Sequence, residues 1–277
     1  MVCAGFSKKN STGVCFGDSG GPLICHQNGQ TVLAGIASWT KPGCNTEMPN
    51  VFTRVSNYID WIQNYTKKTI TPYSNTKDNY ENDYSQENGE AQEYEDEYEY
   101  RDLQENGNSQ EKVLTPGLKK ALQQTPVSCP KLPSFMRGGA QARIIQGHKA
   151  NTPIPWQVSI QDHGGAQICG GTILDKTTII SAAHCFMNKK KDYTKWYVLA
   201  GKISRQSYDG SIRIARTIVH PEWNYDRIVN DVAIVKLSKP LIFDKNIKPM
   251  CLPSKDFKPR IGDMCIVSGW GDTYCKN

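Results

Sequence analysis

Two short stretches, GDSGGP at Gly17–Pro22 and SAAHC at Ser181–Cys185, decide how this chain is interpreted. The first contains a serine followed by two glycines, and the second places a histidine beside a cysteine. A serine becomes a nucleophile when an adjacent base takes its proton, and the oxyanion that then forms needs backbone N–H donors. We therefore predict that Ser19 is a nucleophile and that the amides of Gly17 and Ser19 form an oxyanion hole. A chance turn of this composition is the alternative.

The predicted base for this nucleophile is His184, which follows an apolar run and directly precedes Cys185. A lone histidine is usually structural. Here, however, a disulfide from Cys185 to Cys169, sixteen residues earlier, would pin the loop and hold the imidazole rigidly, as a general base requires. The other histidines have no such context and are predicted to lie at the surface: His26, His148, His163 and His220.

The predicted third member of this site is Asp231, which precedes the apolar run VAIVKL at residues 232–237. An unpaired charge at the start of a buried strand costs free energy, so this carboxylate is expected to have a partner. A buried carboxylate that accepts a hydrogen bond from a catalytic imidazole fixes the tautomer of that imidazole. The alternative is an aspartate in a turn at the edge of a strand.

Together these residues resemble the motifs of the chymotrypsin-like serine endopeptidases, and the RIIQG stretch at Arg143–Gly147 resembles the family's zymogen cleavage junction. In that family, cleavage after the arginine (here Arg143) frees an amino terminus, here Ile144, which pairs with the aspartate before the nucleophile, here Asp18. Gln146 departs from the usual glycine. The resemblance implies an all-β fold of two Greek-key β-barrels. Apolar residues at positions 55, 58, 59 and 62 fit one face of a helix, which predicts a short helix near residues 55–65.

The order of the motifs departs from the family, which runs His, Asp, Ser, whereas this chain runs Ser, His, Asp. Such a circular rearrangement indicates the end of one protease domain followed by the beginning of another, as in a tandem secreted protease such as ovochymase. We therefore expect the true termini to lie outside this sequence, and part of the specificity-pocket wall to be absent. The expected divisions are 1–65 (the C-terminal part of a protease domain), 66–128 (an acidic, tyrosine-rich disordered linker), 129–143 (a propeptide-like segment) and 144–277 (the truncated N-terminal part of a second protease domain).

The segment from Asp78 to Glu111 contains thirteen acidic residues, five tyrosines and one basic residue, with almost no aliphatic side chains. Such a composition cannot bury enough apolar surface to offset the entropy of ordering, so we predict disorder. A solvated linker is one interpretation, and the acidic neighbours of Tyr94, Tyr98 and Tyr100 fit tyrosine sulfation as another. Outside this segment, basic residues exceed acidic ones by 18, which favours acidic or glycan partners.

Cysteine content indicates an oxidising compartment. Ten cysteines predict disulfides and a secreted or extracellular protein, although no leader follows Met1. No apolar run is long enough to span a membrane, and no nucleic-acid partner is expected. The family resemblance implies the pairings Cys169–Cys185, Cys15–Cys44, Cys129–Cys251 and Cys25–Cys265, which leaves Cys3 and Cys275 to pair by default.

The same resemblance assigns residues of substrate specificity. The pocket-floor position, six residues before the nucleophile, is Gly13 rather than the aspartate that selects lysine or arginine. Ser38 and Trp39 resemble the strand that binds the substrate backbone, and Thr40 and Asn50 replace glycines that usually leave the pocket open. A neutral, narrowed pocket favours small or medium apolar P1 residues over basic ones.

Two functions of different classes are consistent with these features. The first is a secreted serine endopeptidase that cleaves protein or peptide substrates after activation by a trypsin-like protease. The second is a catalytically inert, protease-like binding module. The triad residues favour the enzyme, whereas the absent segment favours the module. No metal or other cofactor is expected, since Lys202 replaces an acid that begins the calcium loop of some relatives.

Overall fold

The computed structural model describes residues 1–5, 13–27, 30–44, 48–66, 150–188, 191–205 and 210–272. Residues 1–72 and 128–277 form one compact unit, so both ends of the chain contribute to the same body. The acidic segment lies outside the described residues, as does the predicted activation junction at Arg143 and Ile144.

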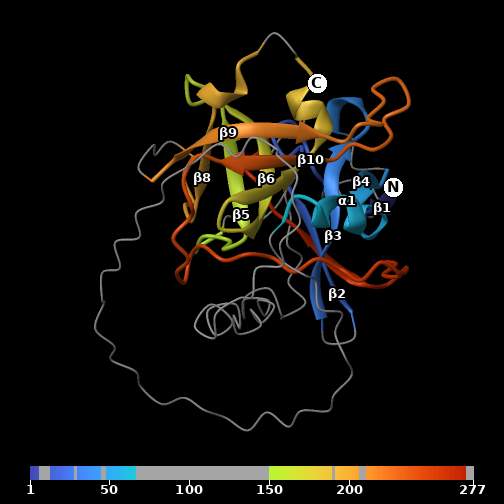
Figure 1. Cartoon of the computed structure of the whole chain (residues 1–277). Coiled ribbons are helices and arrows are strands. Elements are labelled where there is room, and N and C mark those ends of the chain that lie inside the picture. The colour runs from blue at the N-terminus through green and yellow to red at the C-terminus, as the bar shows by residue number, and fades with distance from the viewer. Residues whose placement is uncertain are drawn as a thin grey trace, which may run out of the picture. The chain divides into compact units, whose positions relative to one another are not determined.

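Six antiparallel strands of this unit close into a barrel (Figure 1). Their order around the barrel is β10-β7-β6-β5-β8-β9, and β10 closes it by pairing with both β7 and β9. The strands are β5 (Gln157–Gln161), β6 (Gln167–Asp175), β7 (Thr178–Ser181), β8 (Tyr197–Ala200), β9 (Ile212–Val219) and β10 (Ala233–Leu237). Successive side chains of a strand alternate between its two faces, so β5 turns Val158 and Ile160 to one side and the buried polar Ser159 to the other.

A second sheet has five strands in the order β1-β4-β3-β2-β11 and is drawn from both ends of the chain. Its strands are β1 (Val2–Ala4), β2 (Pro22–Gln27), β3 (Gln30–Trp39), β4 (Asn50–Arg54) and β11 (Met264–Val267). The last strand, β11, pairs with β2 so that Cys265 lies opposite Cys25. The barrel and the curled sheet confirm the predicted all-β fold.

Helical structure is short throughout the described residues. After β4 the chain forms the 3₁₀ turn η2 (Val55–Tyr58) and then α1 (Ile59–Gln63), which confirms the predicted helix near residues 55–65. The other 3₁₀ turns are η1 (Pro42–Cys44), η3 (Ala183–Phe186) and η4 (Tyr193–Lys195). In the described part of the chain, no helix has the length and apolar character needed to cross a membrane.

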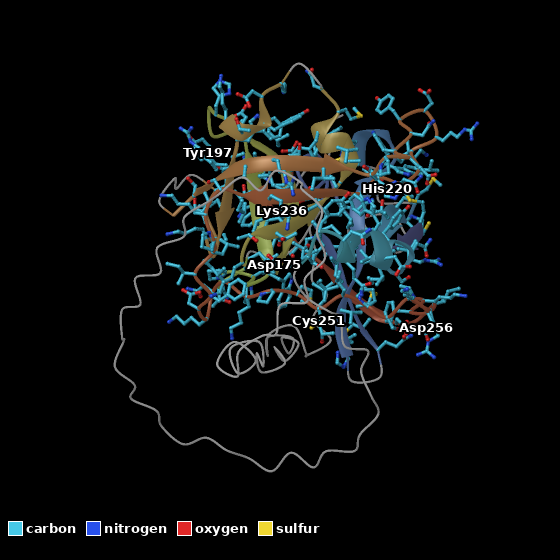
Figure 2. All side chains as sticks on the ribbon, viewed as in Figure 1. Asp175, Tyr197, His220, Lys236, Cys251 and Asp256 are labelled. Atoms are coloured by element: carbon cyan, nitrogen blue, oxygen red, sulfur yellow. A yellow bond between two sulfur atoms is a disulfide. The ribbon has the colours of Figure 1, made fainter. Side chains whose placement is uncertain are left out.

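One apolar core joins the two chain segments. The first chain segment is the described part of residues 1–66, and the second is that of residues 150–272. Leu33, Ile36 and Ile62 of the first segment belong to the same buried cluster as Ile160 and Ile180 of the barrel in the second. The burial of apolar surface is the main favourable contribution to folding, so this shared cluster stabilises the assembly of the two segments. A polar contact adds to it, because Nζ of Lys236 on β10 (labelled in Figure 2) donates to the carbonyl of Tyr65, which lies beyond α1.

Three of the disulfides that the family resemblance implied are present: Cys15–Cys44, Cys25–Cys265 and Cys169–Cys185. Cys251 is also disulfide-bonded, and its expected partner Cys129 lies outside the described residues. The default pairing of Cys3 is wrong, since Cys3 is an exposed free thiol. Cys3 lies on β1, at the opposite edge of the sheet from β11, and Cys275 lies outside the described residues.

Candidate active site

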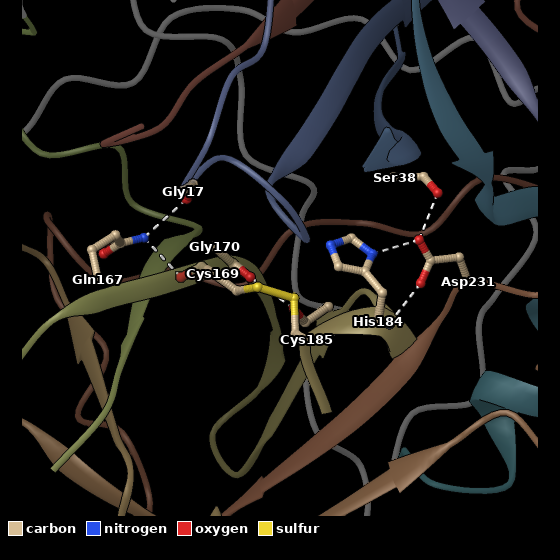
Figure 3. Close-up of a disulfide and its surroundings, with 9 residues drawn as sticks. Gly17, Ser38, Gln167, Cys169, Gly170, His184, Cys185 and Asp231 are labelled. Carbon is tan, nitrogen blue, oxygen red and sulfur yellow. Dashed lines mark hydrogen bonds and ion pairs between the residues drawn. A yellow bond between two sulfur atoms is a disulfide. The ribbon is translucent and has the colours of Figure 1, made fainter. Parts of the chain in front are cut away.

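The centre of the site is a pair of residues from the barrel, His184 on η3 and Asp231 just before β10 (Figure 3). His184 Nδ1 lies 2.8 Å from Asp231 Oδ2, and the backbone amide of His184 donates to Oδ1 at 2.9 Å. Because a carboxylate only accepts hydrogen bonds, the neutral imidazole carries its proton on Nδ1 in this contact. Its Nε2 is then able to accept a proton. The Cys169–Cys185 disulfide, which starts at the residue after His184, holds this loop on β6.

Asp231 is fully buried and is supported by donors from the first chain segment. Ser38 Oγ donates to its Oδ2 at 2.5 Å, and Thr53 Oγ1 donates to its backbone carbonyl at 2.8 Å. Ser38 and His184 thus satisfy a charge that would otherwise be costly to bury, and Thr53 holds the backbone of the same residue. The two chain segments therefore share the positioning of one carboxylate.

The residue before this carboxylate, Asn230, is held in the left-handed conformation with φ of 59°. Its Oδ1 accepts a hydrogen bond from Tyr58 OH at 2.9 Å, and its Nδ2 donates to the carbonyl of Glu222 at 2.8 Å. Burial, and secondarily the charge of Asp231, raise the pKa of Tyr58, so its hydroxyl stays a donor. Tyr58 thus anchors the loop that presents Asp231.

His220 was expected at the surface but lies half-buried at the base of the same loop. Its ring packs edge-on against Tyr58 and tilted against Trp61, with ring centroids 5.4 and 5.0 Å away (Figure 2). Burial lowers the pKa of His220. Its contacts are those of a packing residue between α1 and the loop.

Ser19 lies in a tight turn that packs against the barrel. Its carbonyl accepts a hydrogen bond from the Gly170 amide of β6 at 2.7 Å, and the Gly20 amide donates to the carbonyl of Ala37 at 2.8 Å. Gly20 has φ of 80°, and a Cβ there would lie 2.2 Å from Ser181 Oγ, so glycine alone fits. The turn therefore lies against the segment that leads to the histidine.

The described residues contain no hydrogen bond between Ser19 Oγ and His184, although both belong to the same compact unit. Contacts between a nucleophile and its base are often long without substrate and shorten in the reactive complex. Ser19 also lines a pocket of about 350 Å³, and this pocket includes Ser38, whose hydroxyl donates to Asp231. The structure thus gathers the three predicted residues into one region.

Asp18, beside the nucleophile, carries a buried carboxylate capped by two backbone amides. The amides of Cys15 and Gly271 donate to its two oxygens, each at 2.9 Å. Burial is the largest influence on this group and raises its pKa from 3.8 to about 6, against the lowering by the two amides. A Cβ on Gly269 or Gly271 would overlap the carboxylate, so only glycine fits around it.

The buried side chain of Asn50 joins two residues that line the pocket beside Ser19, Val14 and Thr40. Asn50 Oδ1 accepts a hydrogen bond from the Val14 amide at 3.1 Å, and Nδ2 donates to Thr40 Oγ1 at 2.6 Å. Asn50 is buried, and a Cβ on Gly13 would lie 2.4 Å from its Oδ1. The pocket is lined by Val14, Cys15, Phe16, Ser19, Ala37, Ser38, Trp39, Thr40 and Lys41.

The structure also places the remaining predicted residues and adds three that the sequence did not reveal. Ser38, expected to contact the substrate backbone, directs its hydroxyl to Asp231, while Trp39 beside it is 45% exposed. The added residues are Thr53, Tyr58 and Gln167. No local signal identifies Thr53 or Gln167, whereas Tyr58 lies on the apolar face that predicted the helix.

Potential metal ligands in the described part of the chain do not form a metal site. One group, Cys169, His184 and Cys185, brings ligand atoms within 4.8 Å of one another. The two cysteines are joined in a disulfide, so neither offers the thiolate that binds metal.

Comparison with known proteins agrees with the site. The Trypsin family model matches residues 1–62 and 144–277. Transmembrane protease serine 9 of Rattus norvegicus is 31% identical to the chain over 289 residues, an alignment that covers 98% of the chain and 25% of that protein. The chain thus spans about a quarter of the length of this curated relative. With its two ends matched by one family model and its His–Asp pair formed, the chain belongs to the trypsin family of serine proteases.

Proposed function

We propose that the chain is a serine endopeptidase that cleaves peptide bonds through an acyl-enzyme. The observation that carries this proposal is the His184–Asp231 pair, which is buried on the Asp231 side and supported by Ser38 from the opposite chain segment. A histidine with only a structural role does not need its acceptor, Asp231, to be held by Ser38, which lies 193 positions away in the sequence. Ser19 supplies the nucleophile, and the amides of Gly17 and Ser19 form the oxyanion hole.

The chemistry proceeds in two balanced halves. His184 Nε2 takes the hydroxyl proton of Ser19 as Oγ bonds to the substrate carbonyl carbon, and the carbonyl oxygen becomes an oxyanion. The imidazolium, stabilised by Asp231, returns the proton to the leaving nitrogen, so the C–N bond breaks and the acyl-enzyme remains. Water then repeats the sequence with His184 as base, which releases the acid and regenerates Ser19.

The pocket geometry supports a preference for small or medium apolar P1 residues. Asn50 is buried behind the pocket wall and ties together Val14 and Thr40, two residues that line it, at a position where a glycine would leave more space. Gly13 offers no carboxylate to a basic group. Discrimination between apolar side chains of different length in such a pocket is worth about 1–3 kcal/mol for each methylene.

Activation is proposed to follow cleavage after Arg143. A new ammonium at Ile144 would pair with the carboxylate of Asp18, which burial makes costly to ionise. This pairing would order the adjacent Gly17 amide. The activating enzyme would be a protease with trypsin-like specificity, because the bond follows an arginine.

The arrangement of the parent protein is also a proposal. The alignment to the rat relative covers 98% of the chain in 289 residues, so both ends of the chain align with one stretch of that protein. We assign residues 1–65 to the end of one protease domain and 144–277 to the beginning of the next, with 66–128 as linker and 129–143 as propeptide. The disulfides support a secreted protein or an extracellular position on a longer one.

A fluorophosphonate probe tests the activity. The chain, cleaved after Arg143, is expected to be labelled at Ser19, and Ser19→Ala abolishes labelling. Arg143→Gln blocks cleavage there and keeps labelling low after trypsin treatment. If the cleaved chain shows no labelling, the endopeptidase assignment is wrong, and binding of the intact protein to heparin or an acidic peptide then tests the inert-module alternative.

A further inference from the structure

The carbonyl of Gly17 is held by a side chain from the barrel, that of Gln167 at the start of β6 (Figure 3). Gln167 Nε2 donates to the Gly17 carbonyl at 3.2 Å and to the Cys169 carbonyl at 2.8 Å. Its Oε1 accepts a hydrogen bond from Ser159 Oγ. All the polar atoms of this amide therefore have partners, and one of these partners belongs to the other chain segment.

The Gln167 amide is itself fixed by a chain of buried groups on β5. Ser159 is fully buried, and Gln161 Nε2 donates to Ser159 Oγ at 3.1 Å. The same Gln161 nitrogen donates to the carbonyl of Arg205 at 2.9 Å. Buried, fully satisfied polar networks are rigid, so Gln167 presents its N–H to Gly17 from a fixed position.

Gly17 needs such a support because its own backbone is permissive. Its φ is 92°, in the region that favours glycine, and glycine gains no rigidity from a side chain. The peptide group before it is anchored, because the Phe16 carbonyl accepts from the Asp272 amide at 2.9 Å. The peptide group after it is anchored by Gln167. The two peptide planes that meet at Gly17, one with its N–H and the other with its carbonyl, are thus both held.

We propose that Gln167 is a positioning residue for the oxyanion hole, acting through the carbonyl of Gly17. This inference rests on the proposed endopeptidase function. Gln167 does not touch the reacting atoms, and it fixes the direction of the one donor that Gly17 supplies. An amide does not titrate, so the support is independent of pH.

Loss of the Gln167 support is expected to weaken the binding of the transition state. The oxyanion exists only after Ser19 has attacked, so a misdirected Gly17 N–H weakens transition-state binding and leaves substrate binding unchanged. Loss of a whole oxyanion donor lowers kcat by roughly 100- to 1000-fold. Loosening a donor that remains present is expected to cost less, about tenfold in kcat with KM unchanged.

Three variants test this in the chain cleaved after Arg143. Gln167→Met keeps the length of the side chain and removes both of its hydrogen-bonding groups. Gln167→Glu keeps an acceptor for Ser159 and removes the donor to Gly17. Gln27→Met is the matched control, because Gln27 is a half-buried glutamine at the end of β2 whose amide donates to Asp263, just before β11. A peptide anilide with valine at P1 gives kcat and KM, and a peptidyl boronate gives the affinity for a tetrahedral adduct.

The expected result is a drop of about tenfold in kcat for both Gln167 variants, with an equal loss in boronate affinity and no change in KM or in Gln27→Met. If Gln167→Glu retains the wild-type kcat, the contact with Ser159 is the important one and the inference is overturned. A rise in KM with kcat unchanged also overturns it.

A second measurement does not depend on activity. In ¹⁵N-glycine-labelled protein carrying Ser19→Ala, the Gly17 amide resonance should move when Gln167 becomes methionine and stay in place in Gln27→Met. A change in this resonance supports the positioning even if the unmodified chain proves inactive, in which case the proposed function alone fails. An unmoved resonance contradicts the inference whatever the kinetics show.

Discussion

The barrel and the five-stranded sheet divide the site between them and differ in how they hold together. The barrel is built from one continuous stretch, β5 to β10, and closes on itself, so its His184–Asp231 pair forms from neighbours in the same segment. The sheet combines β1 to β4 with the distant β11 and is open at β1 and β11 in the described residues. The half of the site that carries Ser19 therefore depends more on assembly than the half that carries the base.

The largest expected effect comes from a substitution in the part of the site that the barrel carries. Asp231→Asn keeps the shape of the side chain but can donate where the carboxylate accepts, so His184 takes the wrong tautomer. We expect kcat to fall by about 10⁴-fold with the fold intact. Asp226→Asn, an exposed residue in the same loop, is the control and should leave kcat unchanged. A loss below tenfold in Asp231→Asn would contradict the assignment of Asp231.

The sheet can be weakened separately by removing the disulfide that joins β2 to β11. Replacing Cys25 and Cys265 by alanine should lower the free energy of unfolding by about 2–5 kcal/mol, because this disulfide spans 240 residues. Hydrogen exchange should then rise in β2, β3 and β11 and change little in β5 to β8. Cys3→Ser, which alters a free exposed thiol, should change neither region. Equal loss of protection in both regions would show that they unfold as one.

A third prediction concerns the buried carboxylate of Asp18, which lies shortly before β2. The pKa of Asp18 is about 6 in the folded chain and 3.8 ordinarily, so the folded state binds this proton more tightly. Its contribution to stability is therefore full below about pH 4 and is lost as pH rises through about 6. The loss amounts to about 3 kcal/mol, from 1.36 kcal/mol for each pKa unit.

Urea unfolding of the uncleaved chain at pH 4 and pH 7 measures this dependence. Asp18→Asn carries no titrating group and should remove that part of the pH slope, while Asp226→Asn retains it. Identical slopes in the wild type and Asp18→Asn would show that the carboxylate is hydrated in the folded state.

The smallest predicted effect lies at the contact between the two regions. Tyr58→Phe removes the hydroxyl that donates to Asn230, at a cost of about 1 kcal/mol, and should lower kcat several-fold through looser placement of Asp231. Tyr65→Phe makes the same chemical change near the end of α1 and serves as the control. Equal kcat values for the two variants would assign Tyr58 a packing role only.

Much of the site could be predicted because its residues sit in local patterns. GDSGGP is interpretable without its neighbours, and Asp231 stands out as a charge before an apolar strand. The supports of these residues could not be found in this way. Thr53 and Gln167 reach partners 178 and 150 positions away, and nothing near them in the sequence specifies that contact.

The specificity residues show a similar limit. Thr40 and Asn50 were recognised separately as replacements that narrow the pocket, whereas their mutual hydrogen bond depends on how β3 and β4 pair. The free thiol of Cys3 was missed for a related reason, since pairing by elimination takes no account of where a cysteine lies in the fold, here on the edge strand β1.

The Cys25–Cys265 bond has a consequence beyond covalent linkage. These residues face each other directly in the β2–β11 ladder, and a slip of one residue would turn every side chain of β11 to the other face. Such a slip would also move the segment after β11 and bring Trp270 toward the place of Gly271, against the Asp18 carboxylate, where no side chain fits. By excluding neighbouring registers, a disulfide at the edge of the sheet selects which residues surround the acid beside the nucleophile.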